Sequence, residues 1–117
     1  MKRLDISNVI YILIIILVFT VSQAFSQITV KHFNAEWNKS NGVEWFMDLE
    51  DCKTKGTTDI AKNPDIAKKY KIAVVPTNII FKDGEEVARF QADLSFKMVA
   101  TREEIQEEID EQLMSDF

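Results

Sequence analysis

Apolar residues are concentrated at the start of the chain. An unbroken apolar run fills residues 9–19, after a basic pair at residues 2–3 and before small residues at positions 22, 24 and 26. This order is typical of a signal peptide. The run is also shorter than the roughly 20 apolar residues that a membrane-spanning helix needs. We therefore predict a signal peptide over residues 1–26, with cleavage after Ser26 and Gln27 as the first residue of the exported domain.

An uncleaved signal anchor is the alternative interpretation of this segment. Counted over residues 6–21, the apolar stretch is almost long enough to span a bilayer, and its basic residues would lie on the cytoplasmic side. No cysteine lies near residue 26, which disfavours a lipoprotein anchor. Both interpretations place residues 27–117 in the periplasm or outside the cell, with membrane contact only through an uncleaved N-terminal segment.

The first half of the remaining chain predicts a strand, a short helix and a second strand. Residues 28–33 are rich in β-formers and alternate in part, as in a strand, and the polar residues 34–42 follow as a turn. Asn41 with Glu44 three residues later is typical of a helix start, and we expect a short helix over residues 41–50. Its apolar positions fall on two faces: Val43, Phe46 and Met47 on one, Trp45 and Leu49 on the other.

Residues 53–58 contain threonines that favour a strand, although Gly56 weakens it. Asn63 followed by Pro64 predicts a helix start, with Asn63 as the cap and the helix running to about Tyr70. The apolar residues 72–81 are interrupted by Pro76, which belongs at the start or edge of a strand.

The last third predicts a hairpin and a final helix. Asp83-Gly84 lies between two apolar runs and is a strong two-residue hairpin signal. Thr101 with Glu104 forms a capping-box pattern, followed by apolar residues at four-residue spacing, Ile105, Ile109 and Leu113. The predicted order of elements is that of one small α/β domain over residues 27–117, with a mixed sheet and helices on both faces.

The net charge of residues 27–117 disfavours one class of partner. Residues 27–117 hold 12 of the 14 basic and 18 of the 19 acidic residues, a net charge of −6. Nucleic acid is therefore a poor partner. The final helix carries an acidic cluster that we interpret as a solvated face, with a basic partner as the alternative: Glu103, Glu104, Glu107, Glu108, Asp110 and Glu111.

Three motifs resemble the thioredoxin family. They are Phe33-Asn-Ala-Glu-Trp37, Val75-Pro76-Thr77 and Phe81-Lys-Asp-Gly84, and the resemblance covers essentially all of residues 28–114. It implies the thioredoxin fold, with a cis proline at Pro76.

The resemblance also implies that the redox centre is lost. The two cysteines that follow the tryptophan in thioredoxins are replaced here by Asn38 and Asn41, in the tetrad Asn38-Lys39-Ser40-Asn41. Disulfide exchange needs an attacking thiolate and a resolving thiol, and asparagine supplies neither. The family's buried carboxylate falls at His32, and its first tryptophan falls at Asn34.

A binding edge is the function that this pattern favours. By the resemblance, seven residues meet at one edge, and we expect Asn38 and Lys39 to be exposed there: Trp37, Asn38, Lys39, Ser40, Asn41, Val75 and Pro76. In the family, the residue before the cis proline offers backbone groups to an extended peptide. We expect a non-catalytic module that binds a protein or an extended peptide, without a cofactor.

Two other residues carry alternative hypotheses. Cys52, the only cysteine, is interpreted as a structural thiol far from the edge, with thiol-disulfide chemistry or intermolecular pairing as alternatives. His32, the only histidine, is interpreted as a satisfied or partly exposed strand histidine whose titration near neutral pH affects stability, with a catalytic base as the alternative. No cysteine or second histidine lies near it in the sequence, so no metal site is expected. A purely structural subunit is the third functional hypothesis.

Overall fold

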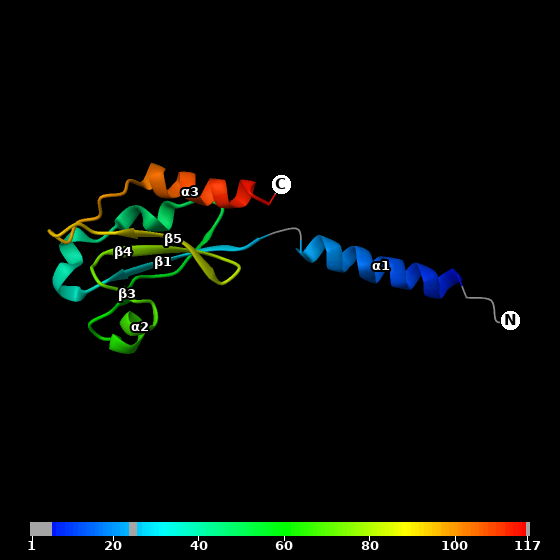
Figure 1. Cartoon of the computed structure of the whole chain (residues 1–117), viewed down its shortest axis with the longest axis horizontal. Coiled ribbons are helices and arrows are strands. Elements are labelled where there is room, and N and C mark those ends of the chain that lie inside the picture. Colours follow the sequence, from blue (N-terminus) through cyan, green and yellow to red (C-terminus); the bar gives the residue numbers. More distant parts are fainter. Residues whose placement is uncertain (1–5, 24–25, 117) are drawn as a thin grey trace.

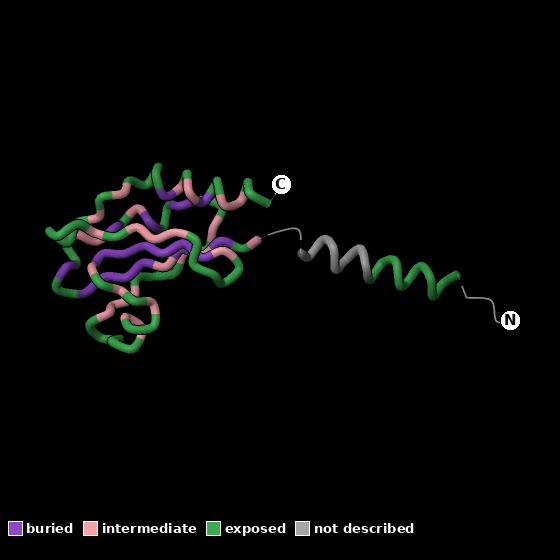
Figure 2. The backbone as a smooth tube through the Cα atoms, in the orientation of Figure 1, coloured by how far each residue is buried: buried purple, intermediate pink, exposed green. Residues whose placement is uncertain are grey.

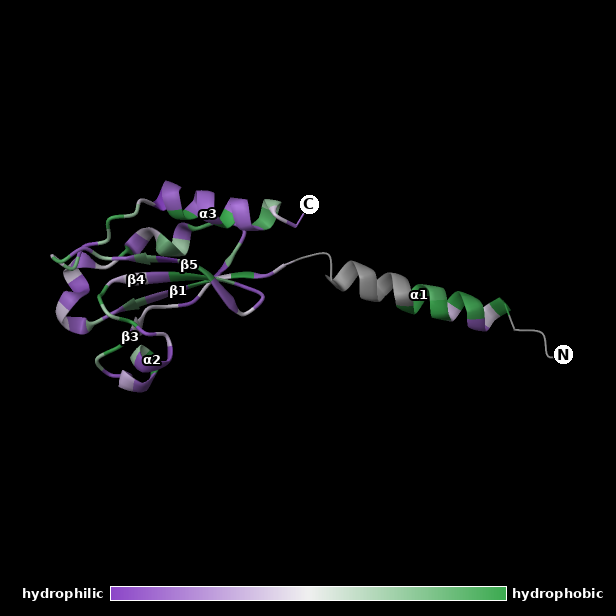
Figure 3. Cartoon of the chain, in the orientation of Figure 1, coloured by the Kyte–Doolittle hydropathy of each residue, from purple (hydrophilic) through white to green (hydrophobic). Residues whose placement is uncertain are grey.

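The computed structural model describes residues 6–23 and 26–116, and for residues 16–23 it describes the backbone alone. Helix α1, Ile6–Gln23, extends away from the domain (Figure 1) and is strongly apolar where its side chains are described (Figure 3). Within the described residues, no helix combines the length and the apolar character that crossing a membrane requires. The basic pair at residues 2–3 and Ala24, just before the predicted cleavage site, lie outside the described residues.

A mixed five-stranded sheet forms the centre of the domain. Its strands are β1 Ile28–Asn34, β2 Lys53–Thr54, β3 Thr58–Asp59, β4 Thr77–Lys82 and β5 Glu85–Gln91. The order is β2-β1-β4-β5, and β3 also pairs with β1. Strands β2 and β3 run parallel to β1, whereas β4 is antiparallel to both β1 and β5. The two central strands, β1 and β4, are the most buried (Figure 2).

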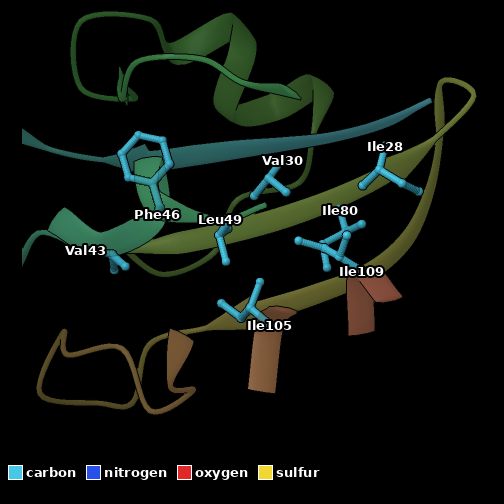
Figure 4. Packing of buried hydrophobic residues seen from close by; sticks show 8 residues of the cluster. All are labelled: Ile28, Val30, Val43, Phe46, Leu49, Ile80, Ile105 and Ile109. Atoms are coloured by element: carbon cyan, nitrogen blue, oxygen red, sulfur yellow. The ribbon is translucent and has the colours of Figure 1, made fainter. Parts of the chain in front are cut away.

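Helices cover both faces of this sheet, as predicted. On one face, α3, Arg102–Met114, packs Ile105 and Ile109 against the side chains of β1 and β4 (Figure 4). On the other face, α2, Pro64–Lys69, and the residues after it pack Ile66 and Tyr70 against a second cluster centred on Phe33. The predicted fold class is confirmed: this is the α/β thioredoxin fold.

The predicted α-helix over residues 41–50 is wrong. Two 3₁₀ helices take its place, η1 Glu36–Asn41 and η2 Glu44–Asp48, and Asn41 ends the first of them instead of capping a helix. The buried side chains there are Val43, Phe46 and Leu49, while Met47 is 53% exposed. Spacing by three is the period of a 3₁₀ helix, so the apolar pattern belongs to that geometry and not to an α-helix.

The strand predicted over residues 53–58 is split in two. Thr29 and Val30 pair with β2, whereas Phe33 and Asn34 pair with β3. Residues 55–57 belong to neither strand. Gly56 lies in this gap, consistent with its weak preference for extended structure.

The hairpin and the final helix follow the sequence signals closely. Asp83 and Gly84 have φ values of 51° and 86°, as a type I′ turn between antiparallel strands requires. At the start of α3, Oγ1 of Thr101 accepts a hydrogen bond of 3.2 Å from the backbone N–H of Glu104. Both predictions are confirmed.

Helix α2 starts where predicted but is capped differently. Pro64 occupies the first turn, yet the Asn63 side chain makes no cap bond; its Nδ2 donates to the carbonyl oxygen of Asp59 at 2.9 Å. The helix ends at Lys69, and Arg89 on β5 donates hydrogen bonds to the carbonyl oxygens of Tyr70 and Lys71 just beyond it. These bonds tie the end of α2 to the sheet.

Candidate functional site

The segments of the predicted edge meet at one end of the sheet. Phe33 on β1 pairs with Thr77 on β4, so the η1 helix that follows β1 lies beside the proline loop that precedes β4. The Val75–Pro76 peptide bond is cis, as the resemblance implies. Nδ2 of Asn38 lies 3.3 Å from the carbonyl oxygen of Val75, which joins the two segments directly.

Asn38 is the hub of this edge and is not exposed as expected. It is 3% exposed. Its Nδ2 lies within hydrogen-bond distance of three acceptors: Oδ1 of Asn34 at 3.1 Å, the Val75 carbonyl at 3.3 Å and the Phe96 carbonyl at 3.1 Å. An amide has only two N–H groups, so these acceptors share them. The buried Asn38 side chain therefore links the three segments of the edge by hydrogen bonds.

The second substituted position completes this network. Nδ2 of Asn41 donates to Oδ1 of Asn38 at 2.9 Å, and Nδ2 of Asn34 donates to the backbone carbonyl of Asn38 at 3.3 Å. Asn38 is thus hydrogen bonded to both Asn34 and Asn41. The arrangement stabilises one conformation of the edge and presents no nucleophile.

The exposed part of the edge is smaller than the predicted set. Trp37 is 64% exposed, and Lys39 and Ser40 are also exposed, whereas Val75 and Pro76 are buried. A partner at this edge would therefore touch η1 first. The buried residues Val75 and Pro76 support that surface from below.

Phe96 belongs to the same surface and was missed from the sequence. Its ring meets the ring of Trp37 edge-on, with centroids 5.0 Å apart and planes at 89°, and it remains 39% exposed. Asp93 holds the loop: its Oδ1 accepts hydrogen bonds from Ser95 and from the N–H of Lys97, and Phe96 itself has a φ of 62°. The only sequence signal was an aromatic residue between polar ones in a loop.

His32 lies directly behind this edge and is 2% exposed. Its Nδ1 is 2.7 Å from Oγ1 of Thr57, and its ring stacks on Phe46 with centroids 4.6 Å apart. Burial lowers the pKa of His32 to about 4. The interpretation of His32 as a partly exposed histidine with a titration near neutral pH is corrected, because the ring is buried and the interior disfavours its charged form.

A second buried polar residue lies beside His32 on the adjacent strand. Asn78 on β4 is paired with His32 on β1 and is fully buried. Within the described part of the chain, Nε2 of His32 and both side-chain polar atoms of Asn78 have no hydrogen-bond partner. The sheet thus carries a buried polar pair where most of its neighbours are aliphatic.

Cys52 lies apart from the edge. It is half-buried against the core cluster that Ile105 and Ile109 of α3 cover, and it immediately precedes β2, whose Lys53 pairs with Thr29. The edge adjoins Phe33, four residues further along β1, or roughly 13 Å at the usual strand rise. Burial, and secondarily the charge of Asp51, raise the pKa of the Cys52 thiol, which disfavours the reactive thiolate.

No group of three or more potential metal ligands lies together within residues 6–23 and 26–116. The edge residues that the structure describes offer hydrogen bonds, apolar contacts and the exposed charge of Lys39.

The sequence comparison points to thioredoxins. No protein-family model matches the sequence. A chloroplastic thioredoxin Y1 from Arabidopsis thaliana is 50% identical over 44 residues, which is 38% of this chain and 26% of that protein. The match therefore spans about a quarter of the length of this curated relative.

Solved structures extend the similarity to most of the domain. A thioredoxin from Schistosoma mansoni superimposes with a TM-score of 0.57 and 25% identity, covering 81% of this chain and 85% of that one. A mutant thioredoxin from Halobacterium salinarum gives a TM-score of 0.59 at 21% identity, covering 74% and 75%. With the sheet topology and the cis proline, these similarities show that the domain has the thioredoxin fold.

Proposed function

We propose that the chain is an exported, non-catalytic thioredoxin-fold protein that holds a protein or an extended peptide at the edge formed by η1, the proline loop and the Phe96 loop. The observation that carries this proposal is the exposed Trp37–Phe96 ring pair beside a closed asparagine network. Tryptophan is among the residues that most often dominate the binding energy of interfaces. Two large rings left in solvent beside an inert centre favour binding over catalysis.

Recognition at this edge is proposed to rest on side chains. The carbonyl of Val75 already accepts a hydrogen bond from Asn38, so a peptide strand that paired with this carbonyl would have to share or displace that bond. The side chains of Trp37, Lys39 and Phe96, in contrast, are exposed to solvent. We therefore assign the main contacts to the two rings, with polar contacts from Lys39 and Ser40.

Thiol-disulfide chemistry through Cys52 is supported less well. A raised thiol pKa lowers the fraction of thiolate at neutral pH, and the cysteine lies away from the edge that thioredoxins use. We expect negligible reduction of a disulfide substrate by the full-length chain. Thioredoxin-like turnover that Cys52→Ser abolishes would contradict the proposal.

Affinity capture from the exported fraction of the source cells tests the binding function. The full-length chain is used as bait, with reducing and nonreducing arms, beside Trp37→Ala and the control Met47→Ala, which removes an exposed apolar side chain outside the edge. A partner retained in both arms and lost with Trp37→Ala supports the proposal. A partner seen only without reductant, and lost with Cys52→Ser, overturns it in favour of cysteine chemistry.

A further inference from the structure

A pocket of 330 Å³ lies beside the edge, on the side of η1 that faces β3. Gly42 and Val43, which join the 3₁₀ helices η1 and η2, lie in its lining. Cavities of about 300–1,000 Å³ are the usual size of small-molecule sites. An apolar cavity of about 150 Å³ already accepts benzene, so this pocket has room for a single ring with a short polar tail.

The inner wall of the pocket is apolar and uncharged at neutral pH. Ala35, Val43 and Phe46 line it, together with the ring of His32. His32 is neutral there because its pKa is about 4. Phe46 stacks on this ring from η2, which makes one continuous aromatic wall. Such a wall favours an aromatic or aliphatic body.

The outer part of the lining carries charges of both signs. Lys39 and Lys62 contribute two cations, and neither pairs with an acidic side chain within the described residues. Glu36 and Glu44 contribute two carboxylates, which likewise form no ion pair there. Charged groups left unpaired around an apolar pocket favour a ligand that supplies their counter-charges.

Asp59, the third acidic residue of the lining, already accepts hydrogen bonds from the protein itself. Oδ1 of Asp59 accepts hydrogen bonds from the backbone N–H groups of Ala61 and Lys62, and its Oδ2 accepts one from Glu36. Its role is to hold the turn after β3 against η1. Two lysines and two glutamates therefore remain to meet a ligand, and with Asp59 the lining carries a net charge of −1.

We propose that this pocket binds a small zwitterion with an apolar body, of the chemical class of an aromatic or branched aliphatic amino acid. The apolar body lies against Val43 and Phe46. The ligand's carboxylate faces Lys39 and Lys62, and its ammonium group faces Glu36 and Glu44. The apolar wall of the site is distinct from the Trp37–Phe96 ring pair, and the two sites share Lys39.

Three probes of equal ring size test the proposal: phenylalanine, 3-phenylpropionate and 2-phenylethylamine. Each is titrated at pH 7 into the isotope-labelled full-length chain in detergent micelles, and backbone amide shifts are followed by NMR. We expect saturable shifts at Val43, Phe46 and Thr57, with phenylalanine bound more tightly than either singly charged probe. Absence of saturable shifts, or shifts centred elsewhere, overturns the site; equal or tighter binding of a singly charged probe overturns the zwitterion preference.

Charge variants at the rim sharpen the test. Lys62→Gln is preferred to a change at Lys39, because Lys39 also lies on the proposed binding edge. Lys62→Gln and Glu44→Gln should each weaken phenylalanine binding up to about five-fold, as expected for loss of one exposed ion pair. Lys68→Gln and Glu85→Gln, exposed changes outside the pocket, should leave it unchanged. Equal effects in both pairs of variants would contradict the assignment.

Discussion

The side-chain amide of Asn41 donates a hydrogen bond of 2.9 Å to Oδ1 of Asn38. These are the two positions at which the resemblance to thioredoxins places redox cysteines. Here they are linked by an amide contact, and the nitrogen of Asn38 is in turn directed at Asn34, Val75 and Phe96. The positions that the resemblance assigns to redox cysteines are thus occupied here by a hydrogen-bonded pair of amides.

The first prediction concerns the stability that is lost when the hydrogen bonds of Asn38 are removed. Asn38→Ala should lower the free energy of unfolding by about 1–3 kcal/mol, because it leaves buried acceptors such as Oδ1 of Asn34 without their donor. Urea unfolding of the full-length chain, followed by circular dichroism, measures this. Lys39→Ala, one residue away but exposed, is the matched control and should change stability by less than about 0.5 kcal/mol. Equal small effects would mean that the network contributes nothing.

The second prediction concerns pH. The pKa of His32 is about 4 in the folded chain, against 6.5 for the ordinary side chain. The unfolded state therefore binds the extra proton first, so the stability contributed by neutral His32 is complete above pH 6.5 and is lost as the pH falls from 6.5 towards 4. Between pH 7 and pH 5 this loss should be about 2 kcal/mol.

His32→Gln removes this titration and serves as the comparison, since His32 is the only histidine in the chain. The loss of stability between pH 7 and pH 5 should be smaller in the variant by about the same 2 kcal/mol. An NMR titration of the His32 ring in the native chain should give a midpoint near 4. A midpoint near 6.5 would show that the ring is solvated and that the account of its burial is wrong.

The third prediction separates the 3₁₀ geometry of residues 43–49 from the expected α-helix. Phe46→Ala should destabilise the fold by about 3–5 kcal/mol, because Phe46 fills the first core beside His32. Met47→Ala should cost less than about 0.5 kcal/mol, since Met47 is largely exposed. Thermal unfolding of both variants distinguishes them, and a large loss with Met47→Ala would favour the α-helical alternative.

The fourth prediction concerns the N-terminus. We expect the native protein to begin at Gln27, because a short apolar core is followed by small residues before that position. Intact-mass spectrometry of protein isolated from its own cells decides this. Full-length protein recovered from the membrane fraction would instead support the signal-anchor alternative.

Much of the fold follows from short-range signals in the sequence. The Asp83-Gly84 turn and the Thr101 cap are each fixed by the local conformation that one or two residues adopt, so they could be predicted without tertiary information. The predicted cap at Asn63 failed because its side chain bonds to the carbonyl of Asp59 across a turn. Local propensity does not reveal such competing partners.

The site was harder to predict because its geometry depends on distant segments. Asn38 is buried by contacts with Val75 and Phe96, which lie 37 and 58 residues away in sequence. The residues next to Asn38 in the sequence give no signal of this burial. Phe96 reaches Trp37 only after β4 and β5 have placed its loop beside η1. The resemblance to thioredoxins located the edge, and the packing decided which of its residues face solvent.

The central claim is that a partner binds through the Trp37–Phe96 surface. Its most direct test is the dissociation constant of the captured partner, or of a peptide selected from a library on the full-length chain, measured by calorimetry for the wild type and four variants. Trp37→Ala and Phe96→Ala should each weaken binding at least about ten-fold, which corresponds to a loss of about 1.4 kcal/mol, while Met47→Ala should bind like the wild type. Unchanged binding in both ring variants, with a loss on replacing acidic residues of α3 such as Glu107, would contradict the claim and place the partner on the acidic helix.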